Sequence, residues 1–541
     1  MMRKLLLVLL SAPAILFCAF TVQKRFSQVK KGPNILFAIM DDVTFSHMGA
    51  YGCTWVKTPN FDRIAKNGLL FKNAYTPNAK CSPSRSCILT GRNSWQLEEA
   101  GNHWSYFPSK FVTVAEILSQ NGYEVGFTGK GCAPVVAKNQ DGSPRQLLVK
   151  AYNDLKTIPP TKLISNIDYA ANFEQFLKNK KEEPFFFWYG GLEPHRGYEF
   201  NSGIVKGGKK ISDVPDRDIY PFWPKVDSVK SDLLDYAFEI EYFDKQLGKM
   251  LKLLEETGEL NNTLIIVTSD NGMPFPRVKG QEYEYSNHLP LAMMWADGIS
   301  HPGRMINDMI SNIDFVPTFL ELAGLTHKTN TMQPVTGKSI TDIFTSPKSD
   351  QVDLRRNYVV VGKERHDVGR PNDEGYPIRG IFQDSMLYLR NFKTDRWPAG
   401  NPETGYLNCD GGPTKTVCLN TVYSKTADFK YWLWNFGKRK TEELYNFKKD
   451  PACLNNLIND KRYKALSKKL SDHLLTELKK QGDPRMFGKG YLFDQYPYAD
   501  KTSVNFYERY IIKDKTLNWE WVNDSDFQDL SRIKKATSAL K

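Results

Sequence analysis

The chain has 541 residues, of which 41% are hydrophobic and 25% are charged. These proportions are typical of a soluble globular protein with one large domain and a smaller one, or with two or three average domains. The eight cysteines are too sparse for a disulfide scaffold and form no C-x-x-C zinc pattern. The formal net charge of +12 at pH 7 favours an anionic partner, and sulfated polysaccharide, anionic membrane and nucleic acid all fit.

The N-terminus has the pattern of an export signal. Arg3 and Lys4 precede an apolar run from Leu5 to Phe20, which is short for a membrane span. We predict a signal peptide over residues 1–27 and an exported protein, periplasmic or extracellular, that keeps no membrane span after cleavage. An uncleaved anchor and a lipid anchor at Cys18 are the less favoured alternatives.

Short apolar, β-rich runs then alternate with helical patterns. The predicted buried strands are residues 34–40, 123–128, 184–189 and 264–268. The predicted helices are residues 113–120, 169–178 and 232–256, and the last of these has apolar residues at three- and four-residue spacing. This alternation predicts an α/β fold with a mostly parallel sheet that is sandwiched by helices.

The pattern changes near residue 345. A linker-like stretch, residues 345–350, is followed by one more predicted strand at 358–361, a hairpin at 380–392 and a helix at 465–480. We therefore predict a large α/β domain over residues 32–365 and a smaller α+β C-terminal domain over residues 366–541.

Polar or charged residues follow each predicted strand of the large domain. They are Asp41-Asp42, Gly129-Lys130, Glu193-Pro194-His195-Arg196 and Asp270-Asn271-Gly272. Ligand sites of open α/β sheets lie beyond the carboxyl ends of the strands, so we expect these groups to converge on one site.

Several carboxylates can gather at one point only with a counter-charge, because bare anions repel one another and their desolvation is costly. A set of oxygen ligands without Cys or His favours Ca²⁺ or Mg²⁺ over zinc. Taken alone, Asp41-Asp42 could cap a helix and Asp270-Asn271-Gly272 could form a tight turn. Together, at two strand ends, they predict a metal site.

A reactive position is predicted at Cys81, in the segment Cys81-Ser82-Pro83-Ser84-Arg85. Pro83 suits a helix start, which places Cys81 at the positive end of a helix, where a thiol pKa is lowered and anions are attracted. Arg85 follows one turn later and could bind an oxyanion. For an isolated cysteine the alternative is a buried structural thiol.

This segment, with Thr90-Gly91-Arg92 after it, resembles the signature of the type I sulfatases. Other segments occur in that family's order: residues 34–52, 58–62, 129–130, 194–195, 269–272, 443–446, 450–451 and 455–457. The resemblance covers roughly residues 33–485. Residues 194–196 and 270–276 resemble the heparan N-sulfatase (sulfamidase) branch, and residues 365–379 resemble its bacterial relatives.

The resemblance implies an alkaline-phosphatase-like fold and hydrolysis of a sulfate ester or sulfamate on a glycosaminoglycan or another sulfated polysaccharide fragment. Cys81 would be oxidised to Cα-formylglycine (3-oxoalanine) by a formylglycine-generating or anaerobic sulfatase-maturating enzyme. One hydroxyl of the hydrated aldehyde would attack sulfur. The expected partners are a sulfated saccharide and the maturating enzyme, without nucleic acid.

The same resemblance assigns roles to individual residues. One Ca²⁺ would be bound by Asp41, Asp42, Asp270 and Asn271. Sulfate oxygens would be held by Arg85, Lys130 and Lys279, and His195 would protonate the departing sugar oxygen or nitrogen. Candidates for substrate recognition are Arg196, Arg365, His366, Asp373 and Arg379.

One departure from the family concerns Cys132. Many relatives have Gly-Lys-x-His, whose His is assigned to the last deprotonation, whereas this chain has Gly129-Lys130-Gly131-Cys132. A thiol is a poor base near pH 7 in an anionic pocket, so turnover would use Lys130 or a solvent path, or be slow or absent. Two rival functions follow: a phosphodiesterase or phosphonate hydrolase of the alkaline phosphatase superfamily, and a non-catalytic polyanion-binding pseudosulfatase.

Overall fold

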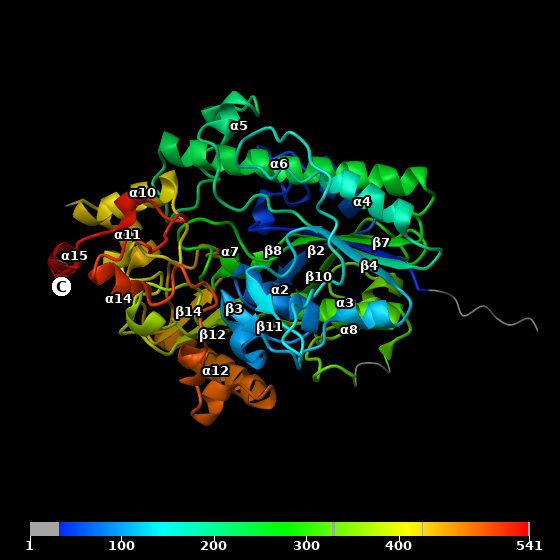
Figure 1. Ribbon diagram of the computed structural model, residues 1–541. Coiled ribbons are helices and arrows are strands. Elements are labelled where there is room, and N and C mark those ends of the chain that lie inside the picture. The colour runs from blue at the N-terminus through cyan, green and yellow to red at the C-terminus, as the bar shows by residue number, and fades with distance from the viewer. Residues whose placement is uncertain (1–31, 327–330, 425, 539–541) are drawn as a thin grey trace, which may run out of the picture. The chain divides into compact units, whose positions relative to one another are not determined.

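The computed structural model describes residues 32–326, 331–424 and 426–538 (Figure 1). The predicted signal peptide lies outside these residues. From Gly32 on, the described chain forms one compact unit. A search of the described residues finds no helix with the length and apolarity that a membrane crossing needs.

A large, mostly parallel sheet carries the strands predicted from the sequence. Its strand order is β10-β2-β9-β7-β1-β6-β4, and β8 pairs with β2. The four predicted strands are β1 (Asn34–Met40), β4 (Glu124–Gly129), β6 (Phe185–Gly190) and β7 (Thr263–Ser269), and they run parallel to one another. The sequence patterns did not indicate β2 (Leu69–Tyr75), β8 (His288–Leu289), β9 (Leu291–Met294) and β10 (Arg304–Ser311), of which β9 runs antiparallel between β7 and β2.

Helices cover both faces of this sheet, as predicted (Figure 1). Leu36, Ala38 and Met40 of β1 pack in one core with α4 (Tyr169–Asn179) and α6 (Asp227–Glu256). The alternate β1 residues, Ile35, Phe37 and Ile39, pack in a second core with α3 (Val114–Gln120) and α8 (Phe315–Leu322). Strand side chains alternate between the two faces of a sheet, so a continuously apolar strand requires a core on each side.

A second, antiparallel sheet follows in the order β11-β12-β13-β14. Its strands are β11 (Tyr358–Lys363), β12 (Ile378–Gln383), β13 (Met386–Asn391) and β14 (Glu442–Asn446), so β12 and β13 form the predicted hairpin. The predicted helix is α12 (Lys464–Lys480), which packs Leu470, Leu474 and Leu478 against this sheet. The α+β character expected of the C-terminal part of the chain is therefore present.

The remaining elements are short. They are α1 (Pro59–Lys66), α2 (Cys81–Thr90), β3 (Ser105–Phe107), β5 (Val135–Ala137), α5 (Ser202–Val205), α7 (Glu284–Asn287), α9 (Thr341–Thr345), α10 (Pro413–Asn420), α11 (Phe429–Phe436), α13 (Leu492–Gln495), α14 (Phe506–Ile511) and α15 (Leu530–Ser538). The seven cysteines of the described residues are all free.

Candidate active site

The carboxyl ends of β1 and β7 bring four predicted metal ligands together. The two strands are parallel and in register, with Met40 opposite Ser269, so Asp41-Asp42 and Asp270-Asn271 leave the sheet side by side. The backbone N–H of Asp42 donates to Asp270 Oδ1 (3.1 Å), and Asn271 Nδ2 donates to Asp42 Oδ1 (2.6 Å). All four side chains are buried.

These oxygen atoms fit a hard divalent cation. Oδ1 of Asp41 and Oδ1 of Asn271 are buried without a hydrogen-bond partner among the described residues. Ligand atoms of Asp41, Cys81 and Asp270 lie within 4.8 Å of one another. Burial, which outweighs the Arg85 guanidinium, raises the pKa of Asp270 to about 7. A bound cation would give these two oxygens a ligand contact and would favour the ionised carboxylates.

Cys81 is the first residue of α2, as the position of Pro83 predicts. Its Sγ atom lies 3.8 Å from Asp42 Oδ1. The expected low thiol pKa is wrong, because burial raises the pKa of Cys81 well above its ordinary value despite the nearby Lys130 and Lys279. The unmodified thiol would therefore stay protonated and unreactive at neutral pH.

Three basic residues predicted to act on sulfate surround the acidic cluster. Arg85 Nε donates to Asp270 Oδ2 (2.7 Å), and Lys130 Nζ donates to Asp41 Oδ2 (2.5 Å). Lys279 Nζ lies 2.7 Å from Asp42 Oδ2 and 2.8 Å from Asp410 Oδ2. Each of these cations is thus bonded to a carboxylate of the predicted metal site.

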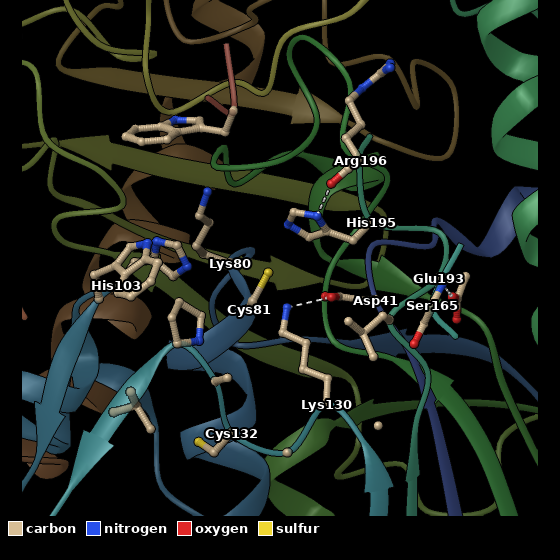
Figure 2. A pocket seen from close by; sticks show the side chains of 18 of the residues that line it. Asp41, Lys80, Cys81, His103, Lys130, Cys132, Ser165, Glu193, His195 and Arg196 are labelled. Atoms are coloured by element: carbon tan, nitrogen blue, oxygen red, sulfur yellow. Dashed lines mark hydrogen bonds and ion pairs between the residues drawn. The ribbon is translucent and has the colours of Figure 1, made fainter. Parts of the chain in front are cut away.

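His195 faces the same cluster. Its Nε2 atom lies 4.0 Å from Asp42 Oδ2, and its Nδ1 atom contacts the carbonyl oxygen of Arg196. Figure 2 shows the ring beside Cys81 and above Lys130. Burial and then Lys279 lower the pKa of His195. If Nδ1 donates to the carbonyl, Nε2 is the ring nitrogen left to exchange a proton in the site.

A cavity of about 870 Å³ opens over these residues. Asp41, Cys81, Lys130 and His195 line it, and so does Cys132. Burial raises the pKa of the Cys132 thiol to about 11, and its Sγ lies 3.5 Å from the Ser86 hydroxyl. A protonated thiol in place of the family's imidazole fits the expectation of a poor base.

The cavity also contains a buried cluster that the sequence did not indicate. Lys80 Nζ lies 2.7 Å from Asp367 Oδ2, and His103 Nδ1 lies 2.9 Å from Asp367 Oδ1. Asp410 and Trp521, from the C-terminal part of the chain, complete this wall. Figure 2 draws Lys80 and His103 on one side of Cys81 and His195 on the other.

The predicted substrate-recognition residues have other partners. Arg196 lines the cavity, but both of its terminal nitrogens are bonded to Asp232 (2.8 and 2.7 Å). The other four predicted residues are absent from the cavity lining. Arg365 donates to the carbonyls of Tyr496 and Pro497, and His366 is bonded to Asn78. Asp373 accepts from the Asn505 N–H, and Arg379 is bonded to Asp483 and Glu364.

In the segment that contains Arg365 and His366, the side chain that reaches the cavity is that of the following residue, Asp367. The dense polar run from Glu364 to Arg370 indicated the segment but not which side chain points inward. Lys80 could have been suspected from its position directly before Cys81, whereas His103 and Asp410 lie in segments without any recognised signal.

A family model of the sulfatases matches residues 33–325, more than half of the chain, and includes Asp41, Cys81, Lys130, His195 and Asp270. The protein belongs to the sulfatase family. The sulfatase is 28% identical to an ulvan-active sulfatase of Formosa agariphila, over 85% of this chain and 82% of the relative. It is 26% identical to human N-sulphoglucosamine sulphohydrolase, over 82% of this chain and 89% of the relative.

Solved structures confirm the predicted sulfatase fold. One, described as being in complex with its substrate D-glucosamine-2-N,6-O-disulfate, superposes with a TM-score of 0.58 at 21% identity. The superposition covers 84% of the chain described here and 99% of the solved structure. The match therefore extends beyond the large sheet into the C-terminal part that carries Asp367 and Asp410.

Proposed function

We propose that this sulfatase removes sulfate from a sulfated carbohydrate, as an ester or a sulfamate, with Cys81 converted to Cα-formylglycine and one bound Ca²⁺. The observation that carries the proposal is the position of Cys81. It begins a helix, 3.8 Å from Asp42, inside a cluster of four buried oxygen-ligand residues. The names of the relatives, which act on ulvan or sulphoglucosamine, support a sulfated sugar.

Asp41, Asp42, Asp270 and Asn271 would hold the cation, which when bound supplies positive charge for the sulfate oxygens and lowers the pKa of a neighbouring hydroxyl. Formylglycine, in its hydrated form, would supply that hydroxyl as the nucleophile. Arg85 would hold Asp270 in place beside the cation, because its Nε atom donates to Oδ2 of this carboxylate, and the cation and Arg85 together would favour the ionised form.

Lys130 and Lys279 would hold sulfate oxygens from two sides. The Lys279 side chain is 1% exposed and the Lys130 side chain 12% exposed, so solvent screens their positive charge little. His195 would give a proton to the departing sugar oxygen or nitrogen through Nε2. In relatives a His at the position of Cys132 takes the last proton, and here Lys130 or solvent in the cavity would do so.

The decisive experiment measures conversion and turnover together. The protein is expressed with a formylglycine-generating or anaerobic sulfatase-maturating enzyme, and the mass of the peptide that contains residue 81 is determined. We expect the aldehyde in that peptide and sulfate release from 4-nitrophenyl sulfate. Cys81→Ala should abolish release without lowering the melting temperature.

The rival functions give different results. An ordinary thiol at residue 81 after co-expression would favour a polyanion-binding pseudosulfatase. Faster hydrolysis of an aryl phosphate diester than of the aryl sulfate would favour a phosphodiesterase. Export to the periplasm or the medium, and the boundary between residues 365 and 366, stay predictions.

A further inference from the structure

The cationic side chains of the cavity are all neutralised by carboxylates. The described cavity lining contains four Lys or Arg residues, and each forms an ion pair: Lys80 with Asp367 (2.7 Å), Lys130 with Asp41 (2.5 Å), Arg145 with Glu116 (2.6 Å) and Arg196 with Asp232 (2.7 Å). The net charge of +12 therefore lies elsewhere on the protein.

These pairs are held firmly. The side chains of Lys80 and Asp367 are both 3% exposed, and Asp232 also accepts from the backbone N–H and the hydroxyl of Thr414. Moving a buried carboxylate away from its partner leaves two uncompensated charges, which is strongly unfavourable. An incoming anion cannot recruit Lys80 or Arg196 without this cost. Lys130 and Lys279 differ, because their partners Asp41 and Asp42 are proposed metal ligands and would be shared with the cation.

Three further acidic side chains line the cavity, and none of them leaves a basic partner free to bind an anion. Asp410 is bonded to Lys279, and Glu193 accepts from Ser165 N–H and the Tyr169 hydroxyl. Oε1 of Glu239 is buried with no hydrogen-bond partner among the described residues. A second sulfate or a carboxylate on the sugar would find no free cation beside these groups, because Asp410 already pairs with Lys279 and burial raises the pKa values of Glu193 and Glu239.

The cavity has side chains that can form hydrogen bonds with neutral groups such as sugar hydroxyls. His103 Nδ1 is bonded to Asp367 Oδ1 (2.9 Å), so Nε2 is the ring nitrogen that can contact a ligand in the cavity. Trp104 and Trp521 add aromatic surface to the same wall. A sugar hydroxyl can donate to or accept from an imidazole and can accept from an ammonium, and a sugar ring can pack on an indole.

We infer that the cavity selects a sugar that carries the scissile sulfate as its only anionic group, and that Lys80, Asp367 and His103 bind the hydroxyls of that sugar. This inference rests on the proposed function. It separates this chain from the structural relative described with a disulfated glucosamine as its substrate. Asp367 is the specificity-determining residue, because its charge neutralises Lys80.

The first test compares pairs of substrates that differ by one sulfate. Monosulfated glucosamines and galactosamines are assayed against the disulfated sugars that contain the same scissile sulfate, with 4-nitrophenyl sulfate as the reference. The best monosulfated sugar should exceed its disulfated partner by about tenfold in kcat/KM, the effect of one unfavourable charge contact. An equal or higher value for the disulfated sugar would overturn the inference.

The second test releases the Lys80 charge. Asp367→Asn keeps the side-chain shape, and it should shift the ratio of disulfated to monosulfated kcat/KM upward by about tenfold. Asp353→Asn is the matched control, since it frees Arg355 on the surface outside the cavity and should leave the ratio unchanged. An unchanged ratio in the folded Asp367→Asn protein contradicts the assignment.

His103→Ala covers the case in which Asp367→Asn does not fold. It should lower kcat/KM for the preferred monosulfated sugar about tenfold more than it lowers kcat/KM for 4-nitrophenyl sulfate, which has no sugar hydroxyls. Equal losses on both substrates would show a structural role only. If the converted wild-type enzyme hydrolyses neither 4-nitrophenyl sulfate nor any sugar, the proposed function itself fails; if only the substrate preference is reversed, this inference alone fails.

Discussion

Lys279 and Asp410 are joined by a buried ion pair, with 2.8 Å between Nζ and Oδ2 and side chains that are 1% and 5% exposed. Lys279 follows the metal-ligand segment of the large sheet, whereas Asp410 comes after the hairpin of the second sheet. The same Nζ atom contacts Asp42. The C-terminal part of the chain thus contributes to the position of the lysine that we propose to hold sulfate.

Asp410→Asn should lower kcat/KM on 4-nitrophenyl sulfate by about 100-fold, because breaking a buried ion pair costs about 3–5 kcal/mol and leaves Lys279 to pair with Asp42 alone. The melting temperature should fall as well. Asp483→Asn breaks a comparably buried pair with Arg379 outside the cavity, so it should cost stability but keep activity. Similar activity losses in both variants would refute a specific role for Asp410.

The sequence could predict the metal ligands because each follows an apolar strand of the same parallel sheet. Because β1 and β7 are parallel and in register, the residues that follow them, Asp42 and Asp270, lie in contact. β2 and β10 were not predicted because polar residues such as Asn73 and Asp308 interrupt their apolar pattern. Asp410 could not be predicted because its loop has no periodicity, and its position depends on packing between distant segments.

The choice between His366 and Asp367 shows a second limit. Both residues follow β11 in a polar run, and the backbone turn there decides which one faces the cavity. Composition indicates where polar side chains gather but not their direction. The helix start at Cys81 was predicted correctly, whereas its thiol pKa was not, because burial outweighs the helix end.

Removal of divalent cations should inactivate the enzyme and lower its melting temperature. The Asp41 and Asn271 oxygens without a hydrogen-bond partner and the raised pKa of Asp270 indicate that a bound cation would stabilise the cluster. Dialysis against EGTA, followed by Ca²⁺, Mg²⁺ or Zn²⁺, should restore the melting temperature best with Ca²⁺ or Mg²⁺. A chelated protein with unchanged melting temperature and full activity would exclude the metal site.

Cys132 should contribute little as a base. Its pKa of about 11 keeps the thiol protonated over the working pH range, so Cys132→Ser should leave kcat within about threefold and the pH profile unchanged. Cys132→His places an imidazole where many sulfatases have one, and we expect it to raise kcat. If the pH profile of kcat lost its change at alkaline pH in Cys132→Ser, a catalytic thiolate at residue 132 would be indicated instead.

His47 should make the fold sensitive to acid. Burial lowers its pKa to about 3, and its ring packs among Trp55, Tyr220 and Tyr236. Below the unfolded pKa of about 6.5 the unfolded chain binds a proton that the folded chain does not, so stability rises with pH in this window and is lost as the pH falls from about 6.5 toward 3.

His47→Gln removes this proton uptake. Between pH 7.5 and 5.5 the free energy of unfolding of the wild type should fall by about 1 kcal/mol more than that of His47→Gln, as measured by urea denaturation at both values. The exposed His301 offers a control, since His301→Gln should follow the wild type. Parallel losses in the wild type and His47→Gln would mean that the His47 imidazole takes up a proton equally well in the folded and unfolded chains, which its closed aromatic surroundings oppose.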